Sequence, residues 1–317
     1  VARLRGMFAY AIWDARRRRL FLVRDRFGKK PLYYAETPAG FYFASELKCL
    51  RGLDIPFEID QDALRFYFQF GHILDPATPF RAVRKLMPGH WMSREADGAL
   101  RQGRYWKLPV PAEEPPPGMT EQDACVRVRE IFDEAVRIRL MSDVPLGAFL
   151  SGGIDSSSVV ASMALQQPAE RVKTFSIGFE EADYDETEFA ALVAAKYNTE
   201  HHRITVRPDS VSLLERLAKV YDEPFNDNSS IPTFIVSEFA VQRVKVALSG
   251  DGGDELFGGY QSFLNMDRLR FADALPQALR KAISAVAAWL PYGAYGKNYL
   301  RMISRPTDLE RYLDNNY

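Results

Sequence analysis

Short apolar or alternating runs, separated by turn residues, dominate the first fifty residues of the chain. The runs cover residues 6–13, 20–23, 31–35 and 41–44. Alternation of this kind between turns is typical of antiparallel strands joined as hairpins. The pattern therefore predicts β-hairpins, with the basic residues 16–19 at a solvated hairpin tip.

Helical spacing first occurs at residues 61–70, where Asp60 is the expected N-cap. Strand-like stretches at residues 90–92 and 104–106 complete the first domain. Residues 109–118 then contain five prolines and few apolar anchors. A segment of this composition predicts a semi-rigid linker and a domain boundary.

The period changes after the linker, where apolar runs alternate with helical patterns. Thr120 and Asp123 have the spacing of a helix cap before the apolar residues of 126–138. Strands are expected at 144–150, 174–179, 202–206 and 244–248, and helices at 156–165, 185–196 (capped by Asp185), 211–221 and 233–241. This alternation predicts parallel βαβ units in a doubly wound sheet, with a ligand site at the carboxyl ends of the strands.

Composition narrows the class of protein. The 317 residues contain 41 Lys and Arg against 42 Asp and Glu, which gives a net charge of −1 and argues against a nucleic-acid partner. Two cysteines, Cys49 and Cys125, form neither a disulfide framework nor a zinc motif, so a reducing cytoplasm is expected. The apolar residues 282–290 fall short of the ~20 needed to span a bilayer. The chain begins with Val1, which indicates a processed chain or a fragment.

The sharpest chemical feature is Ser-Gly-Gly-Ile-Asp-Ser-Ser at residues 151–157, between an apolar strand and a helix. The two glycines let the backbone approach a ligand, and the N–H groups of the new helix favour an anion. The loop therefore predicts a phosphate cradle. It has no Walker lysine, so we expect Mg²⁺ held by Asp155 to supply the positive charge.

A second loop, Ser-Gly-Asp-Gly-Gly-Asp-Glu at residues 249–255, also follows an apolar strand. In a parallel sheet the two loops lie at the same edge. Its acids would repel a phosphate unless a cation lay between them, and oxygen ligands are those that Mg²⁺ prefers. Both loops together predict a site for a magnesium-bound phosphate compound.

Around these loops, residues 144–158 and 249–260 resemble the synthetase domain of glutamine-hydrolysing asparagine synthetases. That domain is a PP-loop ATP pyrophosphatase of adenine nucleotide alpha hydrolase-like fold, which activates a carboxylate as an acyl-adenylate. Residues 6–14, 24–34 and 44–48 resemble the later half of the family's N-terminal-nucleophile glutaminase domain. The resemblance implies an incomplete α+β glutaminase part over residues 1–108, a linker over 109–118 and a truncated α/β ATP-binding domain over 119–317.

The resemblance also assigns roles to individual residues. Asp251 would be catalytic beside the adenylate, at a position where the best-known bacterial relatives carry Glu. Residues 222–232 resemble the family's substrate-side loop, and Glu46 and Lys48 are a hypothetical part of the ammonia path. The nucleotide contacts implied are Leu150 and Ile177 for the pocket, Ser249 and Gly250 for the adenosine, Ser151, Gly152, Gly153, Asp155 and Ser156 for the pyrophosphate, and Asp155 and Asp254 for Mg²⁺.

The activity that the resemblance implies uses ATP, aspartate and glutamine or ammonia. The products would be asparagine, glutamate, AMP and pyrophosphate, with β-aspartyl-AMP as the intermediate. No nucleic acid or membrane is implied, and a homodimer is possible. The family's N-terminal cysteine nucleophile and its downstream catalytic lysine have no counterpart in these residues, so we expect a fragment inactive as a glutaminase. Two alternatives stay open: the same chemistry on another carboxylate, or a non-catalytic nucleotide-binding scaffold.

Overall fold

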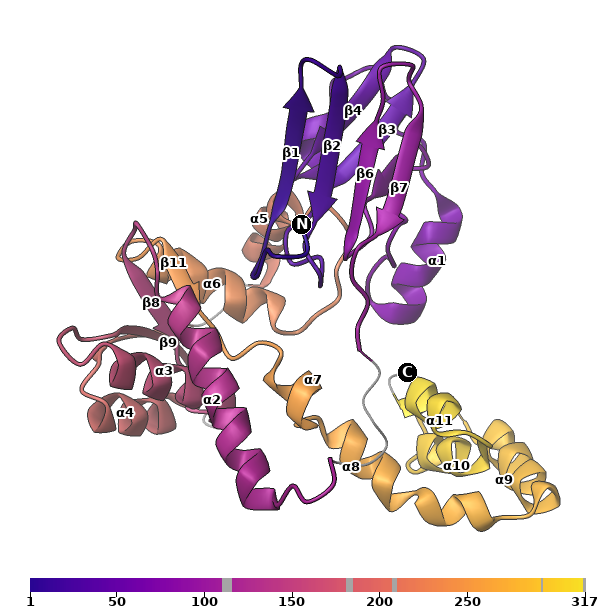
Figure 1. The fold of residues 1–317 in the computed structure, drawn as a ribbon. Coiled ribbons are helices and arrows are strands. Elements are labelled where there is room, and N and C mark those ends of the chain that lie inside the picture. Colours follow the sequence, from indigo (N-terminus) through magenta and orange to yellow (C-terminus); the bar gives the residue numbers. More distant parts are fainter. Residues whose placement is uncertain (110–115, 181–184, 207–209, 292, 316–317) are drawn as a thin grey trace. The chain divides into compact units, whose positions relative to one another are not determined.

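The computed structural model describes residues 1–109, 116–180, 185–206, 210–291 and 293–315 (Figure 1). The chain forms two compact units. The first combines Val1–Arg127 with Pro208–Ile235, and the second combines Val128–Arg207 with Val236–Tyr317. Most of the linker expected over 109–118 lies outside the described residues.

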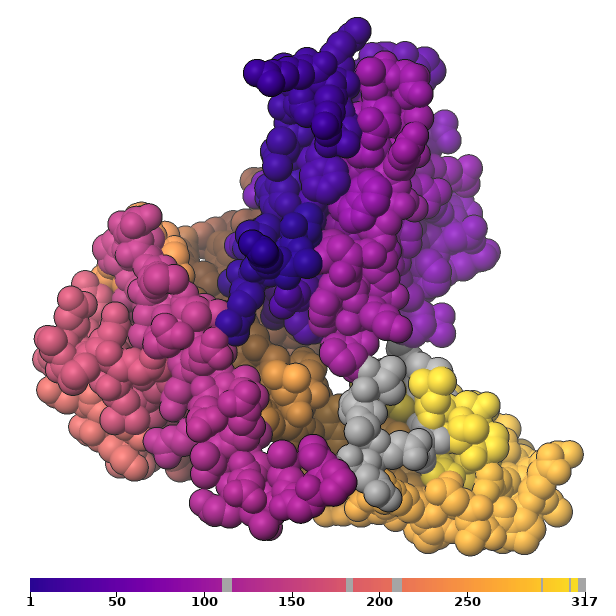
Figure 2. Space-filling view, in the orientation of Figure 1, coloured from indigo at the N-terminus to yellow at the C-terminus, as the bar shows by residue number. Residues whose placement is uncertain are grey.

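Two antiparallel sheets build the first unit. One has the order β1-β2-β6-β7 and the other the order β4-β3-β5. Figure 2 shows the indigo atoms of the amino-terminal strands beside the magenta atoms of residues 90–104, far away in sequence. The strands are β1 (Ala9–Asp14), β2 (Arg19–Arg24), β3 (Tyr33–Thr37), β4 (Gly40–Ala44), β5 (Val83–Lys85), β6 (His90–Arg94) and β7 (Leu100–Arg104).

The predicted hairpins are confirmed, because β1 pairs with β2 and β3 pairs with β4. At the basic tip, Asp14 Oδ1 accepts hydrogen bonds from the backbone N–H of Arg16 and of Arg17, both at 3.0 Å. The strand expected at residues 104–106 is misplaced: β7 ends at Arg104. Its sequence, Leu-Arg-Gln-Gly-Arg, carries one apolar residue, so alternation could not reveal it.

Side chains from both sheets share one core cluster. The residues in it are Leu22, Leu32, Leu86 and Met92, with Ala9, Leu20, Tyr34, Phe41 and Leu100 at its border. Tyr33 and Ala35 point to the other face of the second sheet, where the 3₁₀ helix η1 (Leu47–Leu50) covers them. Alternate residues of β3 thus serve two cores, as the period of a strand requires.

The helix predicted at residues 61–70 is α1 (Gln61–Phe70), and Asp60 is its N-cap. The Asp60 carboxylate accepts from the backbone N–H of Asp62 at 3.0 Å and of Ala63 at 3.2 Å. Gly71 ends the helix in the left-handed region, with φ of 75°. Both ends follow ordinary capping preferences.

Helix α5 (Ser210–Val220) and the start of α6 (Ser230–Ala240) belong to the first unit. The chain thus leaves the second unit after β10 and returns to it within α6. The domain boundary at residues 109–118 stays a proposal. It did not predict that residues 208–235 belong to the first unit.

A parallel sheet with the order β10-β9-β8-β11 forms the centre of the second unit. Ala148 and Leu150 pack with α2, α3 and α4, whereas Phe149 and Phe175 pack with α6. Helices therefore cover both faces, which confirms the doubly wound α/β prediction. The elements are α2 (Glu121–Arg139), β8 (Leu146–Phe149), α3 (Ile154–Gln166), β9 (Lys173–Phe179), α4 (Thr187–Lys196), β10 (Glu200–Val206) and β11 (Val246–Leu248).

The helical carboxyl-terminal part packs around Leu269, Ala272, Met302 and Ile303. Its elements are α7 (Gly253–Phe257), α8 (Gln261–Arg268), the 3₁₀ helix η3 (Arg270–Ala274), α9 (Gln277–Trp289), α10 (Lys297–Ser304) and α11 (Asp308–Asn315). In the described part of the chain, no helix has the length and apolar character needed to cross a bilayer.

Candidate functional site

The two glycine-rich loops leave neighbouring strands. β8 and β11 pair in parallel, from Leu146 opposite Val246 to Ala148 opposite Leu248. The chain adds β9 and β10 on one side of β8 and β11 on the other, so the strand order reverses between these two strands. Ligands of open α/β sheets bind outside the carboxyl ends at such a switch point.

The second loop lies directly against Asp155 of the first. A Cβ atom on Gly250 would lie 2.7 Å from the backbone N of Ser156 and 2.8 Å from Asp155 Cβ. A Cβ atom on Gly253 would overlap the Asp155 carboxyl group. At residue 250 only glycine leaves room for this approach, because the nearest atom belongs to the backbone; at residue 253 a Cβ atom would displace the end of the Asp155 side chain.

Carboxylates gather at this contact. Burial raises the pKa of Asp155, and the negative charges of Asp254 and Glu255 raise it further. Tyr260 Oη donates a 2.7 Å hydrogen bond to Glu255 Oε1; this bond, together with burial and the negative charges of Glu255 and Asp254, raises the pKa of Tyr260 to about 12. Negative charges that disfavour the ionised form of Asp155 in this way would be offset by a cation bound beside it.

The first loop is closed by its own serines. Ser156 Oγ donates to Gly153 O at 3.2 Å and lies 3.0 Å from Ser151 Oγ. The N-cap of α3, Gly153, supplies no side-chain acceptor for the first N–H groups of this 13-residue helix. These donors at the positive end of the helix are suited to an anion.

Ser157 is a further candidate site residue: it lies in the predicted phosphate loop but was not among the residues to which a contact was assigned. Its Oγ is buried and has no hydrogen-bond partner within the described residues. A buried hydroxyl without a partner costs free energy unless a ligand or water satisfies it. Its position in the first turn of α3, two residues after Asp155, is the feature of the sequence that could have identified it.

Gly152 closes the loop against α4. Its φ is +92°, and a Cβ atom there would lie 2.5 Å from Phe189 Cβ and 2.6 Å from the backbone N of Ala190. We expect Gly152→Ala to lower the free energy of unfolding of the second unit by about 3 kcal/mol, because backbone strain and overpacking add. Thermal unfolding without nucleotide is the measurement.

Gly153→Ala is the matched control for that prediction. Gly153 has φ of −65° and a nearest contact of 3.3 Å, to Ser151 Oγ. The control should shift the unfolding midpoint little. Equal shifts for both variants would contradict the steric role of Gly152.

Asp251 lies within the second loop. Ser249 Oγ donates a 2.8 Å hydrogen bond to Asp251 Oδ2, which fixes this carboxylate next to its own strand end. Asp251 is therefore paired with a hydroxyl group of its own loop, whereas Asp254 and Glu255 of the same loop lie near the Asp155 carboxylate.

Leu150 and Ile177 are not brought together. The Leu150 side chain is 1% exposed in the cluster beneath α3, and Ile177 packs with Phe175 on the opposite face of the sheet. Residues 201 and 202 also face apart: His201 Nδ1 lies 3.0 Å from Thr174 Oγ1, while the His202 ring stacks on Phe175. The two histidines do not form a metal pair.

The donor set fits Mg²⁺ better than a metal held by protein alone. Among the described residues, no three His, Cys, Asp or Glu side chains form a metal cluster. Magnesium is usually bound by one or two carboxylates together with water and substrate phosphates. Asp155 and Asp254 beside an anion cradle match that description.

Comparison with known proteins agrees with these features. The family model described as "Asparagine synthase" matches residues 127–317, and that described as "Glutamine amidotransferase domain" matches residues 1–106. These matches assign the two glycine-rich loops to the synthase part and the hairpins of the first unit to the amidotransferase part.

Two relatives cover most of the chain. "Asparagine synthetase [glutamine-hydrolyzing] 1" of Bacillus subtilis is 37% identical over 99% of this chain and 49% of its own length. A putative asparagine synthetase of Methanocaldococcus jannaschii is 39% identical over 88% of this chain and 54% of its own. The chain thus spans about half the length of the curated relatives it matches.

A solved structure, the glutamine-dependent NAD⁺ synthetase of Acinetobacter baumannii in complex with ADP, shares 14% identity with a TM-score of 0.33. It covers 80% of this chain and 61% of that one. The assignment depends instead on the family models, since the first covers more than half of the chain and includes both loops of the site. With its parallel sheet, paired glycine-rich loops and amidotransferase part, the chain belongs to the asparagine synthase family.

Proposed function

We propose that the protein containing this chain is an ATP-dependent amidotransferase that makes asparagine. The observation that carries the proposal is the contact of the two loops around Asp155, at the switch point of the sheet. Aspartate and ATP would give β-aspartyl-AMP and pyrophosphate. Ammonia released from glutamine would then displace AMP and leave asparagine.

In this proposal the first loop binds the phosphates of ATP. The N–H groups of α3 and the hydroxyls of Ser151, Ser156 and Ser157 would hold the departing pyrophosphate. Asp155 and Asp254 would hold Mg²⁺, which offsets charge on that leaving group. Ser249 and Gly250 would contact the adenosine, and Asp251 would lie beside the acyl-adenylate.

The proposed partners are small molecules, namely ATP, aspartate and glutamine or ammonia, with Mg²⁺ as cofactor. The near-neutral charge supports this choice over nucleic acid. A cytoplasmic location, expected from the two cysteines, and a homodimer are also parts of the proposal.

The test is pyrophosphate release by the full-length protein with Mg-ATP and one carboxylic acid at a time. Aspartate should raise the release at least about tenfold above glutamate, which has one more methylene. One asparagine should form per AMP when ammonia or glutamine is added. Preference for another carboxylate would replace aspartate in the proposal, and Mg-ATP binding without any adenylate would favour a scaffold.

A further inference from the structure

A segment from the synthase part of the sequence is attached to the amidotransferase part of the fold. Residues 219–226 lie within the range that the asparagine synthase model matches, yet they belong to the first unit. They begin with the last two residues of α5 and lead to α6, whose last residues pack in the second unit. The contacts that hold this segment therefore attach synthase sequence to the unit that contains the amidotransferase part.

The segment is held first by Lys48, a residue of η1. Lys48 Nζ donates to the carbonyl oxygens of Lys219 and Val220, both at 3.1 Å, at the C-terminus of α5. Asp222 Oδ2 in turn accepts a 2.6 Å hydrogen bond from the backbone N–H of Leu47. A cation at a helix C-terminus and a carboxylate at a helix N-terminus are both favourable placements.

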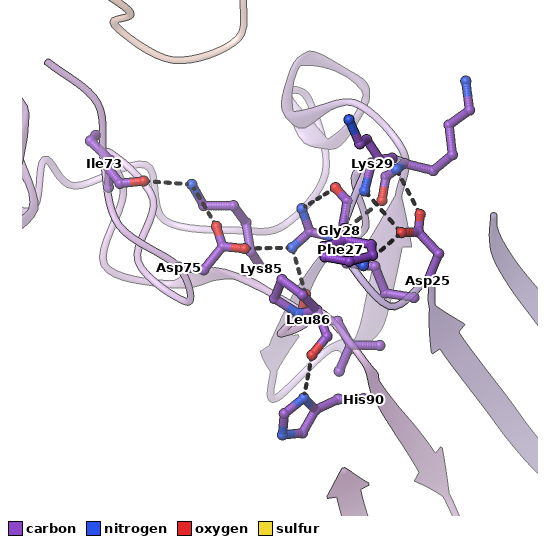
Figure 3. A network of polar contacts seen from close by, with 12 residues as sticks. Asp25, Phe27, Gly28, Lys29, Ile73, Asp75, Lys85, Leu86 and His90 are labelled. Carbon is purple, nitrogen blue, oxygen red and sulfur yellow. Dashed lines mark hydrogen bonds and ion pairs between the residues drawn. The ribbon is translucent and has the colours of Figure 1, made fainter. Parts of the chain in front are cut away.

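Glu223 makes the second attachment, to strand β5. Its Oε2 lies 2.8 Å from Lys85 Nζ, and these side chains are 14% and 8% exposed. Lys85 Nζ also lies 3.2 Å from Asp75 Oδ1 and donates to Ile73 O at 3.1 Å (Figure 3). The Lys85 ammonium group therefore lies between the carboxylates of Asp75 and Glu223 and is itself largely buried.

The contacts continue from Asp75 to a turn of the amidotransferase part. Asp75 Oδ2 lies 2.7 Å from an Arg24 guanidinium nitrogen. The same guanidinium donates to Gly28 O at 2.9 Å and to Lys30 O at 3.1 Å. An unbroken series of charge-assisted contacts thus joins residues 28–30 to residue 223.

Beyond Glu223 the segment forms one wall of a hollow. Asn226 N donates to Gly71 O at 2.8 Å, next to α1. The hollow has a volume of about 430 Å³ and is lined by Phe70, Gly71, His72, Phe225, Asn226, Asp227 and Asn228. Glu223 thus lies two residues before this wall in the chain.

We propose that Lys85 is a positioning residue that couples the two activities: through Glu223 it fixes the segment leading to α6, and through Asp75 and Arg24 it joins that segment to the turn at residues 28–30. The coupling rests on the proposed function. Without the ammonium group, the carboxylates of Asp75 and Glu223 repel each other, and the segment moves away from β5. Ammonia made by one part would then be used less often by the other.

The experiment compares Lys85→Met with Lys85→Arg in the full-length protein. The first keeps the length of the side chain without its charge, and the second keeps the charge. Arg84→Met is the matched control, because Arg84 is the exposed neighbour on the same strand. Three quantities are measured: asparagine formed per glutamine hydrolysed, asparagine formed from added ammonia, and hydrogen exchange of the peptides containing Leu47 and Asn226.

For Lys85→Met we expect asparagine per glutamine to fall about tenfold, as for other misplaced positioning groups, with ammonia-dependent synthesis within about twofold of the unmodified protein. Exchange at Leu47 and Asn226 should become faster. Lys85→Arg should restore most of the coupling, and Arg84→Met should change none of the three quantities. If Lys85→Met does not fold, Lys85→Gln, which also removes the charge, should give the same pattern.

Unchanged coupling in Lys85→Met would overturn the proposal. So would an equal loss of glutamine-dependent and ammonia-dependent synthesis, because that indicates a general loss of folded enzyme. The unmodified protein tests the proposed function separately: if it makes no asparagine from ammonia, that function is wrong. The exchange measurement still decides whether Lys85 holds the segment.

Discussion

Asp155→Asn in the full-length protein is expected to lower aspartate-dependent pyrophosphate release about 100-fold or more, a loss comparable to that of other groups that stabilise transition-state charge. Asp155 is the carboxylate against which both Gly250 and Gly253 pack. Asparagine has nearly the same shape and lacks the charge. The substitution therefore tests the charge and leaves the fit of the two loops intact.

The same variant should be at least as stable as the unmodified protein without ligand. Because burial and the charges of Asp254 and Glu255 raise the pKa of Asp155, the folded state disfavours its ionised form at neutral pH. Removing the charge removes that penalty. An unchanged or higher unfolding temperature, together with lost activity, distinguishes a role in binding from a role in folding.

Asp267→Asn is the control for Asp155→Asn. Asp267 is an exposed residue of α8 whose ion pair with Arg270, at 3.2 Å, is local to that region. Exposed pairs of this kind contribute little. Pyrophosphate release that is equal in the two variants would exclude Asp155 from the phosphate site.

Local signals in the sequence were sufficient for many elements. Asp60 and Thr120 mark the starts of α1 and α2, and each makes its expected capping contact: Asp60 accepts from Ala63 N and Thr120 Oγ1 accepts from Asp123 N. These contacts join residues three apart, so the sequence spacing contains the information. The alternation of strands and helices likewise predicted the parallel sheet.

Long-range polar contacts left no such signal. Lys48 and Val220 are separated by 172 positions, and Lys85 and Glu223 by 138. Single charged residues have no period, and each could equally be a solvated surface group. The attachment of residues 219–226 to the first unit therefore required the structure. Ser157 was missed for a related reason, since burial of one hydroxyl cannot be read from a serine-rich loop.

Two charged side chains of opposite sign bind the backbone of the turn after β2, one at its carbonyl oxygens and the other at its N–H groups. Arg24 takes carbonyl oxygens, as described above, and Asp25 takes N–H groups (Figure 3). The Asp25 side chain accepts from the backbone N–H of Phe8, Phe27, Lys29 and Lys30 at 3.2, 3.1, 3.1 and 2.9 Å. Asp25 is 1% exposed, so water cannot replace these bonds.

We expect Asp25→Ala to lower the free energy of unfolding of the first unit by about 4 kcal/mol or more, since each buried amide left without a partner costs about 1–3 kcal/mol. Asp25→Asn keeps one acceptor oxygen and should lose about half as much. Urea unfolding followed by tryptophan fluorescence is the measurement, because Trp13, Trp91 and Trp106 all lie in the first unit.

Asp97→Ala is the matched control for Asp25→Ala, because Asp97 also accepts a backbone hydrogen bond, from Ala99 N at 2.9 Å, but in an exposed turn. Water can satisfy Ala99 N there, so the loss should stay below about 1 kcal/mol. Similar losses for Asp97→Ala and Asp25→Ala would mean that the four N–H bonds do not hold the turn. A large loss confined to Asp25→Ala would explain why a charged residue lies in a core where an apolar one would otherwise be favoured: the N–H groups of this turn need a buried acceptor. The same turn is joined to Lys85 through Arg24 and Asp75, so its shape also bears on the segment that Lys85 holds.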